Sequence, residues 1–160
     1  MRDTQHEPIE QSPPLALNGR VDSRFLRSLV GYNARRAGVS ILGMFEQRMA
    51  VFQLTPTEFS ILSLIRHNPG ITARAICAEL SLLPPNLARL ISGLDQRSLV
   101  ARQPHPSDGR AVGLTLTGAG DWLMRQAEPA ATQLEIDATE ALTDNERSVL
   151  IELLQRIYTR

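Results

Sequence analysis

The chain contains no lysine, one cysteine and few aromatic residues, and each scarcity narrows what the protein can be. The single cysteine, Cys77, excludes an internal disulfide and a cysteine-based zinc site. No apolar run approaches the roughly 18 residues of a membrane span, and the N-terminus lacks the basic and apolar stretches of a secretory signal. Aromatic residues make up 4% of the chain, so the core must be largely aliphatic, which favours helices over β-sandwiches. We expect a cytoplasmic, mainly helical protein with no membrane partner.

Net charge is also lacking, because 17 basic residues, all arginine, balance 17 acidic ones. A nucleic-acid partner would therefore have to be bound by a local group of arginines rather than by the charge of the whole chain. The guanidinium of arginine suits phosphate, guanine edges or a ligand carboxylate. The three histidines are far apart in sequence, and no nucleophile with a base and no phosphate loop is evident. We expect no enzyme activity, no cofactor and no metal site.

Outside the middle third, the sequence predicts an N-terminal arm and long helices. Residues 1–20 are polar with several prolines, which predicts a mobile arm. Apolar residues at three- and four-residue spacings from Val21 to Phe52 predict one long amphipathic helix. A second helix is expected from Thr117 to about Ala141, kinked at Pro129, and a capping box at 143–146 precedes a last helix.

The middle third has a different order of elements. A capping box at Thr55 and Glu58, with Pro56 at the first helical position, begins a helix that ends at 68–70. A short helix over 73–80, a turn and a helix from Pro84 to about Arg97 follow. Residues 111–116 alternate as a short strand does, and with residues 99–103 they predict a two-stranded hairpin around a polar tip.

Two helices joined by a tight turn make a helix-turn-helix, and a hairpin directly behind it is a wing. The second helix of such a unit fits the major groove of B-DNA, and an arginine at the wing tip can enter the minor groove. We therefore expect these DNA-binding residues: Pro84, Pro85, Asn86, Arg89, Arg102, Ser107, Asp108 and Arg110.

Several short motifs in this order resemble the MarR family of regulators. They are Leu54-Thr55-Pro56, the helix pair, Leu90-Ile91-x-x-Leu94-x-x-Arg97-x-Leu99-Val100, Asp108-Gly109-Arg110, and Leu114-Thr115-Leu116-Thr117-x-x-Gly120. The resemblance covers about residues 22–158 and implies a homodimer whose N- and C-terminal helices intertwine. The expected fold is mainly α with a small β-hairpin wing. It comprises a winged helix-turn-helix lobe (54–116), a helical dimerisation region (21–53 and 117–160) and the arm (1–20).

The sequence departs from that family at the start of the recognition helix. Members usually carry polar residues there, whereas this chain has Pro84-Pro85-Asn86. Prolines supply no hydrogen-bond donors, so base readout would fall to Asn86 and Arg89, with a heavier contribution from DNA shape. The proline rings either pack against a thymine methyl group or only fix the helix start.

Roles at the wing stay open in part. Arg110 is expected in the minor groove, whereas Asp108, repelled by phosphates, is expected to hold the wing through a salt bridge to an arginine. Arg102 is either a phosphate contact or a solvated bystander. Cys77 is either a redox sensor or, as we prefer without a second cysteine, a small core residue.

The resemblance also implies a crevice for a small aromatic acid between the dimerisation helices and the lobe. The candidate ligand-binding residues are Tyr32, Arg35, Arg36, Phe45, Met49, Phe52 and His67. An aromatic acid needs an apolar slot with a convergent arginine. The alternative is that these side chains are dimer-core and surface residues, with His67 favoured at a helix end by the dipole.

Together these features predict a homodimeric, sequence-specific transcriptional regulator that binds double-stranded operator DNA. Its most natural mechanism is repression, relieved by a small aromatic or N-heteroaromatic acid. The alternatives are a ligand-independent regulator and a winged-helix module that binds protein.

Overall fold

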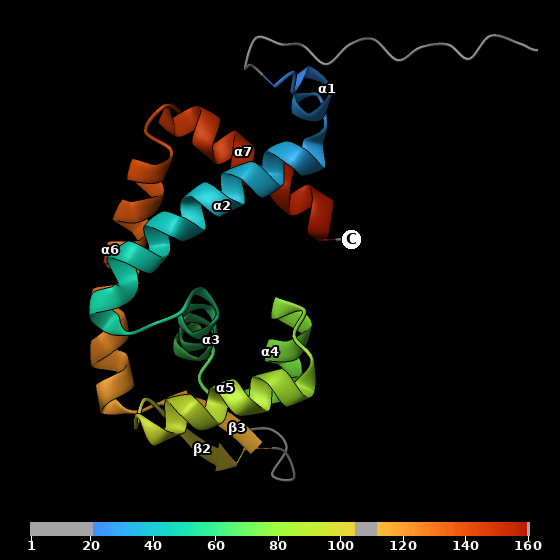
Figure 1. The fold of residues 1–160 in the computed structure, drawn as a ribbon. Helices are drawn as coiled ribbons and strands as arrows, with labels where there is room; N and C mark the ends of the chain where they lie inside the picture. The colour runs from blue at the N-terminus through green and yellow to red at the C-terminus, as the bar shows by residue number, and fades with distance from the viewer. Residues whose placement is uncertain (1–20, 105–111, 160) are drawn as a thin grey trace, which may run out of the picture. The chain divides into compact units, whose positions relative to one another are not determined.

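The computed structural model describes residues 21–104 and 112–159 (Figure 1). These residues belong to two compact units, Met1–Arg36 and Ala37–Arg160. The arm predicted over residues 1–20 lies outside the described residues. The chain is mainly helical and carries one small antiparallel sheet, which confirms the predicted fold class. In the described residues, no helix is long and apolar enough to cross a membrane.

The prediction of one unbroken helix from Val21 to Phe52 is wrong. The segment forms a short helix α1 (Arg24–Arg27), a longer helix α2 (Val30–Met49) and a 3₁₀ turn η1 (Ala50–Phe52). At the first break, the side-chain amide of Asn33 donates to the carbonyls of Arg27 (2.9 Å) and Leu29 (2.8 Å). Side-chain bonds to the backbone thus replace part of the helical ladder there, a competition that periodicity does not reveal.

The three helices predicted in the middle of the chain are present. They are α3 (Pro56–His67), α4 (Ala73–Leu80) and α5 (Pro84–Gln96). Both halves of the predicted capping box form, because Thr55 Oγ1 accepts from the Glu58 amide (3.2 Å) and Glu58 accepts from the Thr55 amide (2.9 Å). Thr72 caps α4 with a single bond, its side-chain oxygen accepting from the amide of Ala75.

The sheet has three strands rather than the predicted two. Strands β2 (Val100–Pro104) and β3 (Val112–Leu116) pair as expected, and a two-residue strand β1 (Ile71–Thr72) pairs with the other edge of β3. The order is β1-β3-β2 and both pairings are antiparallel. A strand of two residues leaves no alternating pattern, so sequence reasoning could not find it.

After the sheet the chain continues into α6 (Gly118–Ala138) and α7 (Asp144–Tyr158). Helix α6 ends at Ala138 rather than near Ala141, and Pro129 lies inside it as predicted. The capping box at the start of α7 also forms, between Thr143 and Glu146.

Within the second unit, one largely aliphatic core is formed by buried residues of the helices α2 to α6 and of the sheet. Ile61, Leu62 and Ile65 of α3 and Met124 of α6 are fully buried, and α3 lies against α6 and β3. The rings of Phe45 and Phe59 meet edge to face at 5.5 Å. Helix α7 contributes no buried residue, although it is rich in leucine, isoleucine and valine.

Candidate nucleic-acid interface

Helices α4 and α5 form the helix-turn-helix. The turn between them depends on Ser81, which adopts a left-handed conformation (φ 52°), and on the amide of Leu82, which donates to the carbonyl of Cys77 at 3.0 Å. Ile76 of α4 and Leu87 of α5 are buried to 0% and 1% exposure and join the common core. The relative position of the two helices is therefore fixed by packing on one side and by the turn on the other.

Helix α5 is divided into a buried and an exposed face. Leu87, Ile91 and Leu94 face the core. Four of the residues predicted to contact DNA lie exposed on this helix: Pro84, Pro85, Asn86 and Arg89. A helix held by one face and bare on the other has the form needed to enter a major groove.

The wing begins shortly after the C-terminal end of α5, with strand β2. Arg102 lies on β2, exposed, and pairs in register with Leu114 of β3. The predicted contact residues Ser107, Asp108 and Arg110 lie outside the described residues. Gly113 lies against Gly70, the residue before β1, since a Cβ atom at Gly113 would be 2.6 Å from the carbonyl oxygen of Gly70. This close approach is how the small edge strand β1 is accommodated.

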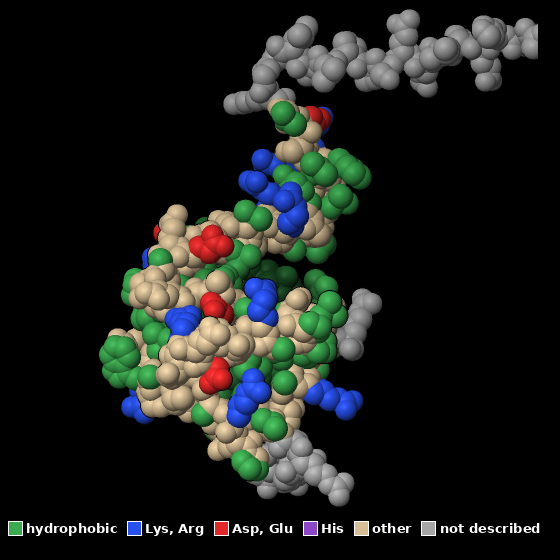
Figure 2. Space-filling model, turned by 60° about the horizontal axis from the view of Figure 1, so that its bottom comes forward, with side chains coloured by type: hydrophobic (Ala, Val, Ile, Leu, Met, Phe, Trp, Pro, Cys, Tyr) green, Lys and Arg blue, Asp and Glu red, His purple; other side chains and the backbone are tan. Residues whose placement is uncertain are grey.

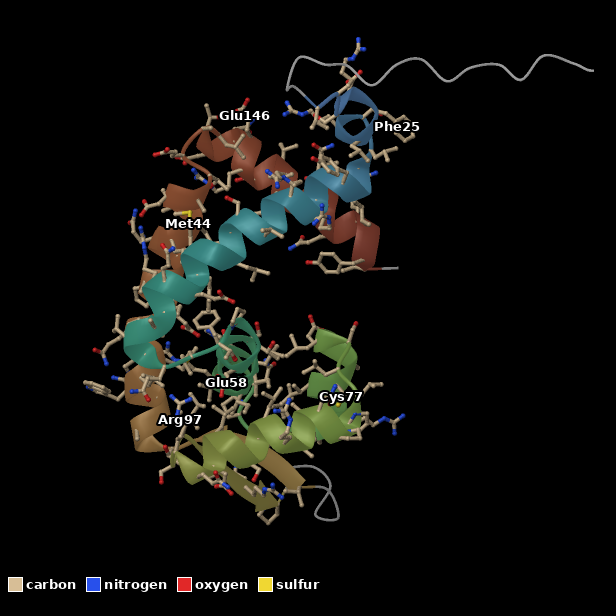
Figure 3. The ribbon with its side chains drawn as sticks, in the orientation of Figure 1. Phe25, Met44, Glu58, Cys77, Arg97 and Glu146 are labelled. Atoms are coloured by element: carbon tan, nitrogen blue, oxygen red, sulfur yellow. The ribbon has the colours of Figure 1, made fainter. Side chains whose placement is uncertain are left out.

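The arginines of the lobe fall into two groups. Arg66 pairs with Asp121 and Glu128, and Arg97 pairs with Glu58 at 3.7 Å while donating to the carbonyl of Phe52 at 3.3 Å. Arg97 therefore ties the end of α5 to the start of α3, as Figure 3 shows.

A second group of arginines is directed to solvent. Arg74, Arg89 and Arg102 are exposed and form no ion pair with any residue that the structure describes. Figure 2, in which the end bearing α5 and the strands is turned forward, shows arginine side chains spread over the surface of the lobe with few acidic ones. Arg74 was not among the residues predicted to contact DNA. Its position in the first turn of the first helix of the helix-turn-helix could have indicated it.

The predicted ligand-binding residues are divided between the two units of the chain. Phe45 and Met49 lie in the core with 7% and 0% exposure, and Phe52 is half-buried against it. Tyr32 carries the guanidinium of Arg35 over its ring at 5.9 Å, and these two residues and Arg36 belong to the first unit.

His67 lies at the end of α3, where the sequence placed it, and its Nε2 atom is 3.0 Å from Glu128 of α6. Ser63 also donates to Glu128, at 3.1 Å, so this carboxylate links α3 to α6. His67 additionally lines a surface hollow of about 290 Å³ between α3 and α4. Its other lining residues are Phe59, Ser60, Ser63, Leu64, Glu79 and Leu80.

Cys77 is half-buried on α4 and packs against the core, close to the side facing α5 (Figure 3). This position agrees with the interpretation of Cys77 as a small packing residue.

Comparison with known proteins supports the DNA-binding interpretation. The MarR family profile matches residues 52–111, which include the whole helix-turn-helix. A solved structure of the transcriptional repressor CouR bound to a 23-mer DNA duplex is 34% identical, with a TM-score of 0.80 over 87% of this chain and 99% of that one. The chain belongs to the MarR family.

Two further MarR-type neighbours carry or respond to small molecules. CouR from Rhodococcus jostii RHA1, bound to p-coumaroyl-CoA, is 26% identical with a TM-score of 0.78 over 84% of this chain and 95% of that one. BpsR from Bordetella bronchiseptica, whose DNA binding is regulated by 6-hydroxynicotinic acid, is 25% identical with a TM-score of 0.74, covering 91% and 97% of the two chains. The curated relatives, one of them assigned to the hcr operon of Thauera aromatica, are likewise transcriptional regulators rather than enzymes. This MarR-family protein is a transcriptional regulator.

Proposed function

We propose that the protein is a homodimeric repressor that occupies a near-palindromic operator and is released by a small aromatic or N-heteroaromatic acid. The observation that carries DNA binding is the exposed face of α5, which presents Asn86 and Arg89 on a helix whose other face is anchored in the core. Two such helices, one from each protomer, would enter successive major grooves about 10 base pairs apart. Occupation of the operator would then block transcription by steric exclusion.

Dimerisation is supported by the surface of α7. Its apolar residues are 39–55% exposed although they recur at helical spacing, namely Val149, Leu150, Ile151, Leu153, Leu154 and Ile157. A contiguous apolar face of this kind marks a protein–protein contact. A second copy of the chain is the natural partner, because a closed two-fold dimer also supplies the two recognition helices that a palindromic operator requires.

Release by an acid is supported by the neighbours that bind or respond to aromatic compounds. The hollow between α3 and α4 combines apolar Phe59 and Leu64 with polar groups, namely the hydroxyls of Ser60 and Ser63, the imidazole of His67 and the carboxylate of Glu79. No arginine is among its described lining residues, so His67 is the group there that could pair with an acid when protonated. An apolar slot with a few polar groups is the usual form of a small-molecule site. A ligand placed there would touch α4 of the helix-turn-helix directly.

The experiment that tests DNA binding is a mobility-shift titration of the full-length protein against its own upstream intergenic DNA at several salt concentrations. We expect a specific shift that weakens steeply as salt rises, since arginine–phosphate contacts release counterions. A shift with no preference over random DNA would contradict the proposal. A winged-helix module that binds protein would show neither the shift nor the salt dependence.

The ligand is tested on the same complex with 6-hydroxynicotinate, p-coumarate, p-coumaroyl-CoA and benzoate as probes. A releasing compound must bind the DNA-free form more tightly, and it should also raise the melting temperature of the free protein. If none of a broad aromatic panel does either, the protein is a ligand-independent regulator. Ser63→Leu, which fills the hollow, should abolish the response, while Ser148→Leu on α7 is the control outside it.

A further inference from the structure

The first turn of α5 has no backbone donor to offer. Its first two residues, Pro84 and Pro85, have no N–H group. The amides of Asn86 and Leu87 are both used internally, since they donate to the carbonyl of Leu83 at 3.0 and 3.1 Å. Ordinarily the first amides of a helix lack partners and can bind phosphates or polar base atoms. This helix cannot make such contacts with its first turn.

The side chains at the same end are apolar and point to solvent. Leu83 stands at the N-cap position, where it forms no capping hydrogen bond, and it is 68% exposed. Polar residues are strongly preferred at that position because they cap the helix. Leu83 therefore serves neither the helix end nor the core, and the two exposed prolines that follow extend the apolar surface.

An apolar hollow adjoins this surface. It has a volume of about 250 Å³ and lies between the N-terminal halves of α4 and α5. Its lining residues are Ala73, Arg74, Cys77, Pro84, Leu87 and Ala88. Moving a methyl group from water into an apolar hollow lowers the free energy of the complex. Arg74 lines the same hollow and is exposed, so a cation lies beside the apolar surface.

We propose that Leu83 and Pro84 read the C5-methyl group of thymine in the major groove, with the hollow beside Pro84 receiving it. The inference rests on the proposed function, because it needs α5 in the groove of an operator. Thymine is the base that presents an apolar group to the major groove, and contact with it requires no donor. Asn86 and Arg89, further along α5, remain available for polar base edges. Leu83 and Pro84 thus determine specificity for an A·T pair in each half-site.

The test uses the full-length protein and a DNA duplex to which it binds. The duplex is obtained by selecting, from a mixture of genomic fragments, those that the protein retains. Each thymine of that duplex is replaced in turn by deoxyuridine, which removes only the methyl group. Loss of one buried methyl contact should weaken binding about fourfold, corresponding to about 0.8 kcal/mol. Replacement in both half-sites should weaken it about 15-fold if the two contacts add.

The reading residues are identified with the double variant Leu83→Ser/Pro84→Ala. Serine is a preferred N-cap and alanine a good helix former, so α5 should be kept or strengthened. In this variant, replacing the sensitive thymine by deoxyuridine should leave the affinity for the duplex almost unchanged. Val51→Ser, which alters an exposed apolar residue of η1 (77% exposed), is the matched control and should retain the full effect.

The outcomes separate the inference from the function on which it rests. If no thymine is sensitive in the wild-type protein, the inference is overturned while operator binding stands. If a sensitive thymine keeps its effect in the double variant, another residue reads the methyl group and the assignment to Leu83 and Pro84 is wrong. If selection recovers no preferred duplex, the proposed function itself fails, and the inference with it.

Discussion

Replacing Gly120 by alanine should destabilise the protein at the joint between the wing and α6. A Cβ atom at this position would lie 2.1 Å from the carbonyl oxygen of Leu99 and 3.0 Å from its carbonyl carbon. Both are backbone atoms, so no side chain can rotate away to relieve the clash. The two segments must separate by about 1.3 Å or more to bring this pair of atoms to ordinary contact distance.

That separation acts on the hydrogen bonds that hold the joint. The amide of Thr117 donates to the carbonyl of Leu99 (3.1 Å), and Thr117 Oγ1 donates to the carbonyl of Ser98 (2.6 Å). Overpacking costs about 1–3 kcal/mol, and each hydrogen bond weakened adds up to about 1 kcal/mol. We therefore expect a loss of about 2–4 kcal/mol, which for a chain of this size lowers the melting temperature by about 5–15 °C.

The same helix supplies a matched control. Gly118 is the first residue of α6, and a Cβ atom there would meet nothing within 4 Å. Gly118→Ala should be neutral or stabilise the protein by about 0.4–1 kcal/mol, because alanine has less freedom in the unfolded chain. Both variants are compared with the wild type by thermal and urea denaturation at one protein concentration, since dimerisation shifts apparent stability. Equal melting temperatures for the two variants would refute the steric argument.

Three further predictions follow from the structure. Arg89→Ala should weaken operator binding at least tenfold and reduce the slope of log affinity against log salt by about 2 per dimer, if each copy contacts a phosphate; Arg156→Ala on α7 should do neither. Leu154→Asp places a charge on the exposed apolar face of α7 and should shift the protein from dimer to monomer in sedimentation equilibrium, and a dimer of unchanged affinity would contradict that interface. Hydrogen bonds from the Thr143 amide and hydroxyl hold the pKa of Glu146 below its usual value, so its stabilisation is present above about pH 4.3 and is lost as the pH falls through the lowered pKa. The difference in unfolding free energy between wild type and Glu146→Gln should therefore shrink from pH 7 to pH 3, and a constant difference would show that the capping carboxylate does not titrate as argued.

Elements with strong local signals were predictable from the sequence. The capping boxes at Thr55 and Thr143 and the proline at the start of α5 define three helix starts, because each uses only neighbouring residues. The buried face of α5 was equally predictable, since Leu87, Ile91 and Leu94 recur at helical spacing.

Features that depend on distant partners were not predictable. The break before α2 follows from the side-chain bonds of Asn33, which a helical pattern conceals. The strand β1 exists only because β3 offers it a partner. Arg97 belonged to a motif that the sequence could identify, but its role as a tie to Glu58 and Phe52 required the fold.

The partition of the arginines explains how a chain without net charge can bind DNA. Within the described residues, the following arginines form ion pairs with carboxylates: Arg24, Arg48, Arg66, Arg97, Arg125 and Arg147. The partners hold these cations to the fold and reduce their field at a distance. Arg74, Arg89 and Arg102 lie on the helix-turn-helix and the wing with no carboxylate of the described chain paired to them. Because phosphate attraction decays over about 10 Å at 0.1 M salt, this local excess governs binding and the neutral total does not.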